Sequence, residues 1–431
     1  MKRNSFKYRV LMLFLSNALL QLMGFAYRAA LSRTAAASAL GLNSLVMQLY
    51  GVAVSLCISG LNVAVQRVCA ASPEKSPAVL KSALAVFAAL WLLAALPAFS
   101  LGRGFSAAAL GSPGAYKTVR LMLACIFMTG VENMLKSVHM GVKRVSRCAV
   151  SELCEQAVRF VLVILFLKRT GPCSDERAAF LIMLGMVFSE FVSVSFLLSS
   201  YFLSVRRPGP IPRVPVMELV RVAFPVTLTA LSANLFSSAG TLLLPGRLAA
   251  FGLSREASLA AIGELNNVCI PISMLPVSLV GAVSAVLMPE AASLFTSGRS
   301  PRRIIGRSIK VSAAASVFAL AVLYPASRTL ASSVFGASVE LLPQALLLLR
   351  AALIFPDLVC VSAMNALGMQ DRVLVNAVVS EAASLAAMLF AASRFGVAGY
   401  ASSLAIGAAL RLALDSPALF VKMNMVFPPE M

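Results

Sequence analysis

Runs of about 20 mostly apolar residues recur along the whole chain, and they constrain its fold more than any other feature. A helix needs about 20 such residues to cross the hydrocarbon core of a bilayer. Apolar residues make up 59% of the sequence and charged residues 13%, whereas a soluble domain has roughly 45–50% and about 25%. The sequence therefore predicts an all-α polytopic membrane protein. Twelve spans are expected, near residues 9–31, 40–68, 78–101, 117–139, 149–168, 177–204, 216–243, 260–291, 306–331, 340–366, 373–393 and 398–421.

The basic residues indicate the orientation of these spans. Twelve spans place both termini on one side, and we expect that side to be the cytoplasm. Of the lysines and arginines, 22 then fall on the cytoplasmic side and 12 on the opposite side, the bias typical of cytoplasmic loops. This bias explains much of the net charge of +20. No separate basic patch with interleaved aromatic residues remains, so we do not expect a nucleic-acid partner.

The longest polar connection, SVRRPGPIPRVPVMEL (204–219), divides the chain almost at its midpoint. Its four prolines prevent a continuous helix. We therefore predict an N-terminal six-helix lobe over 1–205, a cytoplasmic Pro/Arg-rich linker over 206–215, and a C-terminal six-helix lobe over 216–431.

Two arginines occupy matching places in the two halves. Arg28 and Arg247 lie near the outer ends of the first and seventh spans, and each is followed by a small-residue loop and a long helix rich in Gly, Ser, Ala and Val. The match predicts a parallel repeat with a pseudo-twofold axis along the membrane normal. An arginine at the bilayer centre costs at least ~2.5–3.5 kcal/mol. Either side chain could snorkel to the interface, but their matching positions favour a water-filled cavity between the halves.

A cavity with these arginines would prefer an anionic, phosphorylated substrate. The guanidinium group donates paired hydrogen bonds to phosphate oxygens and keeps its charge. The sequence has no Asp or Glu between Val10 and Glu74 or between Arg221 and Glu256, where a cavity for cationic drugs would normally have a carboxylate. The predicted substrate-binding residues are Arg28, Arg247, Arg67, Gln66 and Asn267.

Other ionisable residues fall inside apolar segments. Glu155 and Arg159 lie one helical turn apart, as do Arg411 and Asp415, and we expect both to form structural ion pairs.

Four glutamates have no obvious local partner: Glu132, Glu190, Glu264 and Glu381. Each is a candidate for coupling to a proton or cation. Glu264 is the first choice because it precedes two asparagines, and Glu190 is the second.

Motifs for enzymatic chemistry were not found: the sequence lacks the Walker, GxSxG, HExxH, DxD and CxxC patterns. We therefore expect no enzyme, no catalytic residue, no metal site and no cofactor, and a driving force from an ion gradient, the membrane potential or substrate consumption on the far side. The eight cysteines are interpreted as small buried apolar side chains. His139, the single histidine, is expected at a solvated helix end.

Two stretches resemble a known family. GLNVAVQRVCA (60–70) follows YGVAVSLCISG (50–60), and LPGRL and MPEAASL occur in the seventh and eighth spans. Both resemble the polysaccharide-exporter and stage V sporulation protein B group. That group is related to the lipid II flippases and multidrug exporters of the multidrug/oligosaccharidyl-lipid/polysaccharide (MOP) superfamily.

The resemblance implies twelve or more helices in two lobes around a V-shaped central cavity, in a bacterial cell membrane. It also implies flipping of undecaprenyl-diphosphate-linked sugars, such as a peptidoglycan precursor, a polysaccharide unit or material for the spore cortex. In the lipid II flippases, cavity arginines are thought to meet the diphosphate, and Arg28 and Arg247 match two of them. Ala29 stands where those flippases have an acid, and their two extra carboxyl-terminal helices are absent. These differences favour the sporulation or polysaccharide branch.

The expected partners are a lipid-linked anionic oligosaccharide, membrane lipids and cell-wall synthesis enzymes, with the protein itself a monomer. Two alternatives remain open. A multidrug cation antiporter would share the architecture but would need an acid in the first or seventh helix. A non-transporting membrane scaffold of an envelope or spore-coat assembly would not need the two arginines.

Overall fold

The computed structural model describes residues 6–203, 216–276, 284, 287, 290–295 and 297–426, with side chains from residue 15 onward. Regular secondary structure in these ranges is helical throughout, so the all-α prediction is confirmed. The chain divides into two compact units, Met1–Ser238 and Ala239–Met431, called unit 1 and unit 2 below. The predicted linker over 206–215 lies outside the described residues.

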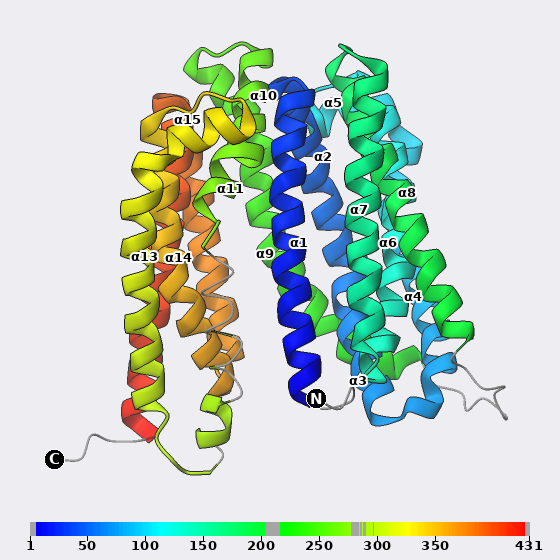
Figure 1. Cartoon of the computed structure of the whole chain (residues 1–431), viewed down its shortest axis with the longest axis vertical. Coiled ribbons are helices and arrows are strands. Elements are labelled where there is room, and N and C mark those ends of the chain that lie inside the picture. The colour runs from blue at the N-terminus through cyan, green and yellow to red at the C-terminus, as the bar shows by residue number, and fades with distance from the viewer. Residues whose placement is uncertain are drawn as a thin grey trace. The chain divides into compact units, whose positions relative to one another are not determined.

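Unit 1 contains the helices drawn from blue to green in Figure 1. A π-helical turn, Ser55–Ser59, joins the second helix to the third, and short 3-10 turns at Pro73–Lys75 and Pro113–Ala115 precede the fourth and sixth. The helices are α1 (Phe6–Thr34), α2 (Ala37–Val54), α3 (Gly60–Ala71), α4 (Ser76–Leu101), α5 (Arg103–Leu110), α6 (Tyr116–Gly141), α7 (Val145–Thr170), α8 (Asp175–Phe202) and the first part of α9 (Val216–Phe251).

Polar side chains in the first part of α9, which belongs to unit 1, bond to α2 and the π turn. Asn234 Nδ2 donates to Ser55 Oγ at 2.5 Å, and Ser238 Oγ lies 3.1 Å from Gln48 Oε1. The boundary between the compact units therefore falls inside α9.

Unit 2 contains the rest of α9 and the helices that follow. The π-helical turns Leu265–Cys269 and Ala331–Phe335 adjoin α10 and α13. The helices are α10 (Arg255–Glu264), α11 (Ile270–Ser273), α13 (Arg302–Leu330), α14 (Leu341–Ala366) and α15 (Gln370–Val426).

Helix α15 is two helices joined at a kink. Gly396 has a φ of 59°, in the left-handed region that favours glycine. Beyond it the chain folds back, since Ser384 Oγ donates to the Ser403 carbonyl at 3.0 Å. The predicted spans 373–393 and 398–421 both lie within α15, one on each side of this kink.

Among the described residues, eight helices are long and apolar enough to cross a membrane. The protein is therefore a multi-pass membrane protein. The predicted spans 9–31 and 149–168 fall on α1 and α7. The predicted span 260–291 is described only in part.

Each unit has its own apolar core. In unit 1, α3, α4, α6 and α8 contribute Leu61, Phe87, Met134 and Leu197, all at most 2% exposed. In unit 2, α14 contributes Phe355 and Val359, and α15 contributes Leu419.

The cysteines and the histidine test two further expectations. All eight cysteines are free. Six of them are buried, which confirms their interpretation as buried apolar side chains, but that interpretation is wrong for Cys154, which is exposed, and Cys173 is half-buried. The expectation of a solvated His139 is wrong. Its side chain is 1% exposed and its Nε2 lies 3.4 Å from the Leu197 carbonyl, because α6 packs against α8 up to its last turn.

Gly130 allows α4 and α6 to approach closely, and this contact predicts the effect of a substitution. A Cβ at Gly130 would overlap the buried Phe87 ring, so Gly130→Ala is expected to cost about 1–3 kcal/mol through overpacking. Trp91, the only tryptophan, has its ring centroid 5.2 Å from that of Phe127 in the same interface. Thermal unfolding followed by its fluorescence in detergent measures the loss.

Gly51→Ala on α2 is the matched control, because a Cβ there meets nothing within 4 Å. We expect it to leave stability unchanged or to raise it by up to about 1 kcal/mol through helix propensity. Equal melting temperatures for the two variants would contradict the close packing of α4 on α6.

Candidate functional site

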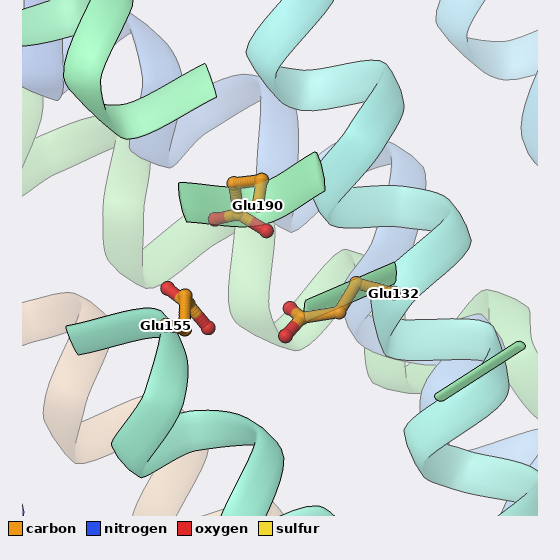
Figure 2. A group of neighbouring side chains, drawn as sticks. All are labelled: Glu132, Glu155 and Glu190. Carbon is orange, nitrogen blue, oxygen red and sulfur yellow. The ribbon is translucent and has the colours of Figure 1, made fainter. Parts of the chain in front are cut away.

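Three helices of unit 1 each bring one glutamate to a common centre. Glu132 comes from α6, Glu155 from α7 and Glu190 from α8, and one carboxylate oxygen of each lies within 4.8 Å of the others. Figure 2 shows the three carboxylates turned toward one another between these helices. We call this group, with the cations described next, the glutamate cluster.

Two cations neutralise part of the cluster. Lys136 Nζ lies 2.8 Å from Glu132 Oε1 and 3.6 Å from Glu155 Oε2. Arg159 pairs with Glu155 and lies 3.3 Å from Glu190 Oε1. The pairs Glu132–Lys136 and Glu155–Arg159 follow from i, i+4 spacing on one helix, whereas the other two depend on the packing of neighbouring helices.

Hydroxyl groups complete the network. Ser193 donates to Glu132 and also hydrogen-bonds to Ser151, and Arg159 Nε donates to Ser189 Oγ at 3.2 Å. Buried polar groups are costly in a membrane unless they are hydrogen-bonded. The serines of α7 and α8 therefore help to stabilise charges that apolar side chains could not.

The charges in the cluster do not balance. Its three carboxylates, of which Glu132 and Glu190 are buried and Glu155 is half-buried, face two cations. Glu152, whose side chain is 38% exposed, adds a fourth carboxylate 3.4 Å from Lys136. Glu190 has a side chain only 3% exposed, and its Oε2 has no hydrogen-bond partner among the described residues. A buried charge without a partner costs several kcal/mol. The cluster can remove this cost by taking up one proton or one monovalent cation.

The predicted substrate-binding residues are divided between the units. Arg28 on α1 is exposed, and so are Gln66 and Arg67 on α3 in unit 1. In unit 2, Arg247 on α9 is exposed. A shared chamber for the arginines of both units stays a prediction.

Of the two polar residues predicted within the eighth span, Asn267 lies in the π turn Leu265–Cys269 of unit 2 and Glu264 directly precedes it. Asn267 is buried, and its Nδ2 donates to the Gly263 carbonyl of its own helix at 3.0 Å. Glu264 is half-buried at the end of α10. Their roles in substrate binding and ion coupling stay predictions.

Sequence reasoning found part of the glutamate cluster. The expected pairs Glu155–Arg159 and Arg411–Asp415 are confirmed. The interpretation that Glu132 has no local partner is wrong, because Lys136 lies one turn further along α6; the i, i+4 spacing could have identified it. The partner of Glu190, Arg159, comes from another helix, and spacing along the sequence carries no signal for such a contact.

Comparison with solved structures identifies the class of fold. An inward-facing multidrug resistance transporter of the MATE family superposes with a TM-score of 0.76, at 18% identity over 96% of both chains. The lipid II flippase MurJ, inward closed, gives 0.74 at 11% identity over 96% of this chain and 89% of that one. A MOP superfamily transporter from Pyrococcus furiosus gives 0.66 at 15% identity over 97% and 95%. The chain therefore has the fold of MOP superfamily transporters.

The sequence itself places the chain in a family. Residues 7–295 match the family described as polysaccharide biosynthesis protein, which is more than half of the chain, so the protein belongs to that family. No curated protein matches the sequence significantly.

The charge balance of the glutamate cluster predicts the effect of removing one cation. Arg159→Gln leaves Glu155 and Glu190 buried without their guanidinium partner, so we expect a loss of stability of about 3–5 kcal/mol. The double variant Arg159→Gln with Glu190→Gln restores the original charge difference and should recover part of the loss. Thermal unfolding in detergent measures both effects. Arg169→Gln, exposed at the end of the same helix, is the control, and equal losses at positions 159 and 169 would contradict the pairing.

Proposed function

We propose that the protein is a flippase that moves an anionic, lipid-linked oligosaccharide across the bacterial cytoplasmic membrane by alternating access. The observation that carries this proposal is the family match over residues 7–295. The fold supports it, because transporters of lipid-linked and of small amphipathic substrates share that fold. We place the protein in the polysaccharide-exporter and stage V sporulation protein B branch, with an undecaprenyl-diphosphate carrier as the substrate anchor.

The proposed architecture has twelve spans, in two six-helix lobes over 1–205 and 216–431, with both termini cytoplasmic. The distribution of basic residues supports this orientation. Cell-wall synthesis enzymes that make or consume the lipid-linked sugar are the proposed partners of a monomeric transporter.

The diphosphate of the substrate is proposed to bind arginine side chains. Arg28, Arg67 and Arg247 are exposed on helices of the two units, and each could donate paired hydrogen bonds to phosphate oxygens. Gln66 beside Arg67, and Asn267 in unit 2, would contact polar groups of the same substrate. The stretches between Val10 and Glu74 and between Arg221 and Glu256 contain no carboxylate that would repel the diphosphate there.

Ion coupling is proposed at the glutamate cluster, with Glu190 as the residue that gains and loses a proton. Among the described residues, one excess negative charge in the cluster and the Glu190 oxygen without a hydrogen-bond partner support this assignment. Glu264 is the second proposed coupling residue.

A multidrug cation antiporter is the second candidate function, because a multidrug transporter has the highest of the three TM-scores given above. The lack of Asp and Glu between Val10 and Glu74 and between Arg221 and Glu256 argues against a cationic substrate.

The arginine assignment predicts a loss of transport. A charge-assisted hydrogen bond contributes about 1.5–3 kcal/mol, so Arg28→Ala and Arg247→Ala should each weaken substrate binding roughly tenfold to a hundredfold. Both variants should fail to support growth of a strain depleted of its own lipid-linked oligosaccharide flippase, although both insert normally. Arg169→Ala and Arg328→Ala, exposed arginines of units 1 and 2, are the matched controls. Growth supported by both test variants would refute the assignment and favour a scaffold.

The coupling assignment predicts a separate effect. Glu190→Gln fixes the side chain in a neutral state, so transport in proteoliposomes should lose its dependence on an imposed pH gradient while substrate binding is retained. Glu74→Gln, exposed in the turn before α4, should keep that dependence. A gradient response in Glu190→Gln equal to that of the unaltered protein would exclude Glu190 as the coupling group.

A further inference from the structure

A second group of charged and polar side chains lies in unit 2, around the Arg411–Asp415 pair. Asp357 comes from α14, Asn376 from the first part of α15, and Arg411 and Asp415 from the part beyond the Gly396 kink. The fold-back of α15 therefore brings together residues that are far apart in sequence. We call Asp357 and Asp415 the aspartate pair.

One guanidinium group serves both carboxyls of the pair. Arg411 Nε lies 3.1 Å from Asp357 Oδ2 and 3.7 Å from Asp415 Oδ2. Asn376 Nδ2 donates to Asp415 Oδ1 at 2.7 Å. Both carboxyl groups therefore lie within 3.7 Å of the same nitrogen atom, and two like charges share a single cation.

The pair is deeply buried. The Asp415 side chain is 0% exposed and that of Asp357 6%, and they adjoin the apolar core formed by Phe355, Val359 and Leu419. One oxygen of each, Asp357 Oδ1 and Asp415 Oδ2, has no hydrogen-bond partner among the described residues. Burying an oxygen without a hydrogen-bond partner is unfavourable, and more so when the oxygen carries charge.

The charges around the pair do not remove this excess. The Cys360 thiol of α14 is within electrostatic range of both carboxyls. Glu381 lies within electrostatic range of Arg350 and Arg411, so Glu381 and Arg350 add one charge of each sign. Helices α11 and α13 both pack on α14. Helix α11 has no charged residue. The basic residues of α13 are all exposed: Arg302, Arg303, Arg307, Lys310 and Arg328. Among these described residues, the three carboxyl groups of Asp357, Asp415 and Glu381 exceed the two guanidinium groups of Arg350 and Arg411 by one charge.

We propose that Asp357 and Asp415 form a proton-binding site that holds one shared proton. Adjacent carboxylates cannot both stay ionised in a buried position, and such pairs titrate as a unit. One proton balances the charge, because Arg411 already neutralises one carboxylate. The proton bonds to one of the two unpartnered oxygens, and the resulting O–H donates to the other, so both oxygens gain a partner.

A metal ion fits this site poorly. Asp357 Oδ1, Asp415 Oδ2 and Asn376 Oδ1 are three oxygen ligands, whereas hard cations such as Ca²⁺ take six to eight. The Arg411 guanidinium would also repel a cation bound between the carboxyls. The site does not depend on the transported substrate, so this inference goes beyond the proposed function and can succeed or fail separately from it.

Infrared spectroscopy tests the proposal without a substitution. The chain has four aspartates, Asp175, Asp357, Asp371 and Asp415, so protein labelled with ¹³C at the aspartate side-chain carboxyl distinguishes them from all glutamates. At neutral pH we expect one protonated-carboxyl band that shifts with this label. A spectrum in which every labelled aspartate is ionised would overturn the proposal, as would loss of the band when sodium chloride replaces choline chloride.

Substitutions then assign the band. Asp357→Asn and Asp415→Asn each imitate the protonated member of the pair, so each variant should fold and lose the labelled band, because the remaining aspartate pairs with Arg411. Asp371→Asn, exposed at the start of α15, should keep it. A labelled band that persists in both folded test variants would show that the proton lies elsewhere.

Discussion

The free-energy cost of burying a charged side chain among apolar ones determines where this protein can place its ionisable residues. Most of the described chain consists of helices, and their apolar side chains form buried clusters within each unit. The charged side chains of Glu132, Glu155 and Glu190 lie where α6, α7 and α8 meet and supply partners. A buried carboxylate without a partner destabilises such a unit by several kcal/mol. Binding of one proton or one monovalent cation removes this cost, so the cluster can bind and release a single positive charge.

The arginines follow a different pattern. Arg159 and Arg411 bind carboxylates inside a unit, whereas Arg28, Arg67 and Arg247 are exposed on helices of a membrane protein. The first kind balances internal charge, and the second kind is proposed above to bind the anionic substrate. This division matches the proposed function, in which substrate binding and ion coupling use separate residues.

The sequence predicted the class of fold because hydropathy reports directly on membrane-spanning helices, and each apolar segment in the described ranges falls on a helix. Local spacing also predicted the pairs Glu155–Arg159 and Arg411–Asp415. Spacing could not predict that Arg159 reaches Glu190, that Asp357 adjoins Arg411, or that His139 is buried. Those contacts join residues that are 31, 54 and 58 positions apart, and only the packing of neighbouring helices determines them.

The central claim is that exposed arginines of both units recognise an anionic lipid-linked substrate, and native mass spectrometry of the purified protein tests it most directly. The account predicts a co-isolated polyprenyl-diphosphate species on the unaltered protein that is absent from the variant carrying both Arg28→Ala and Arg247→Ala. Equal retention of that species by both proteins, or an unaltered protein that retains only cationic amphipathic molecules, would contradict the account.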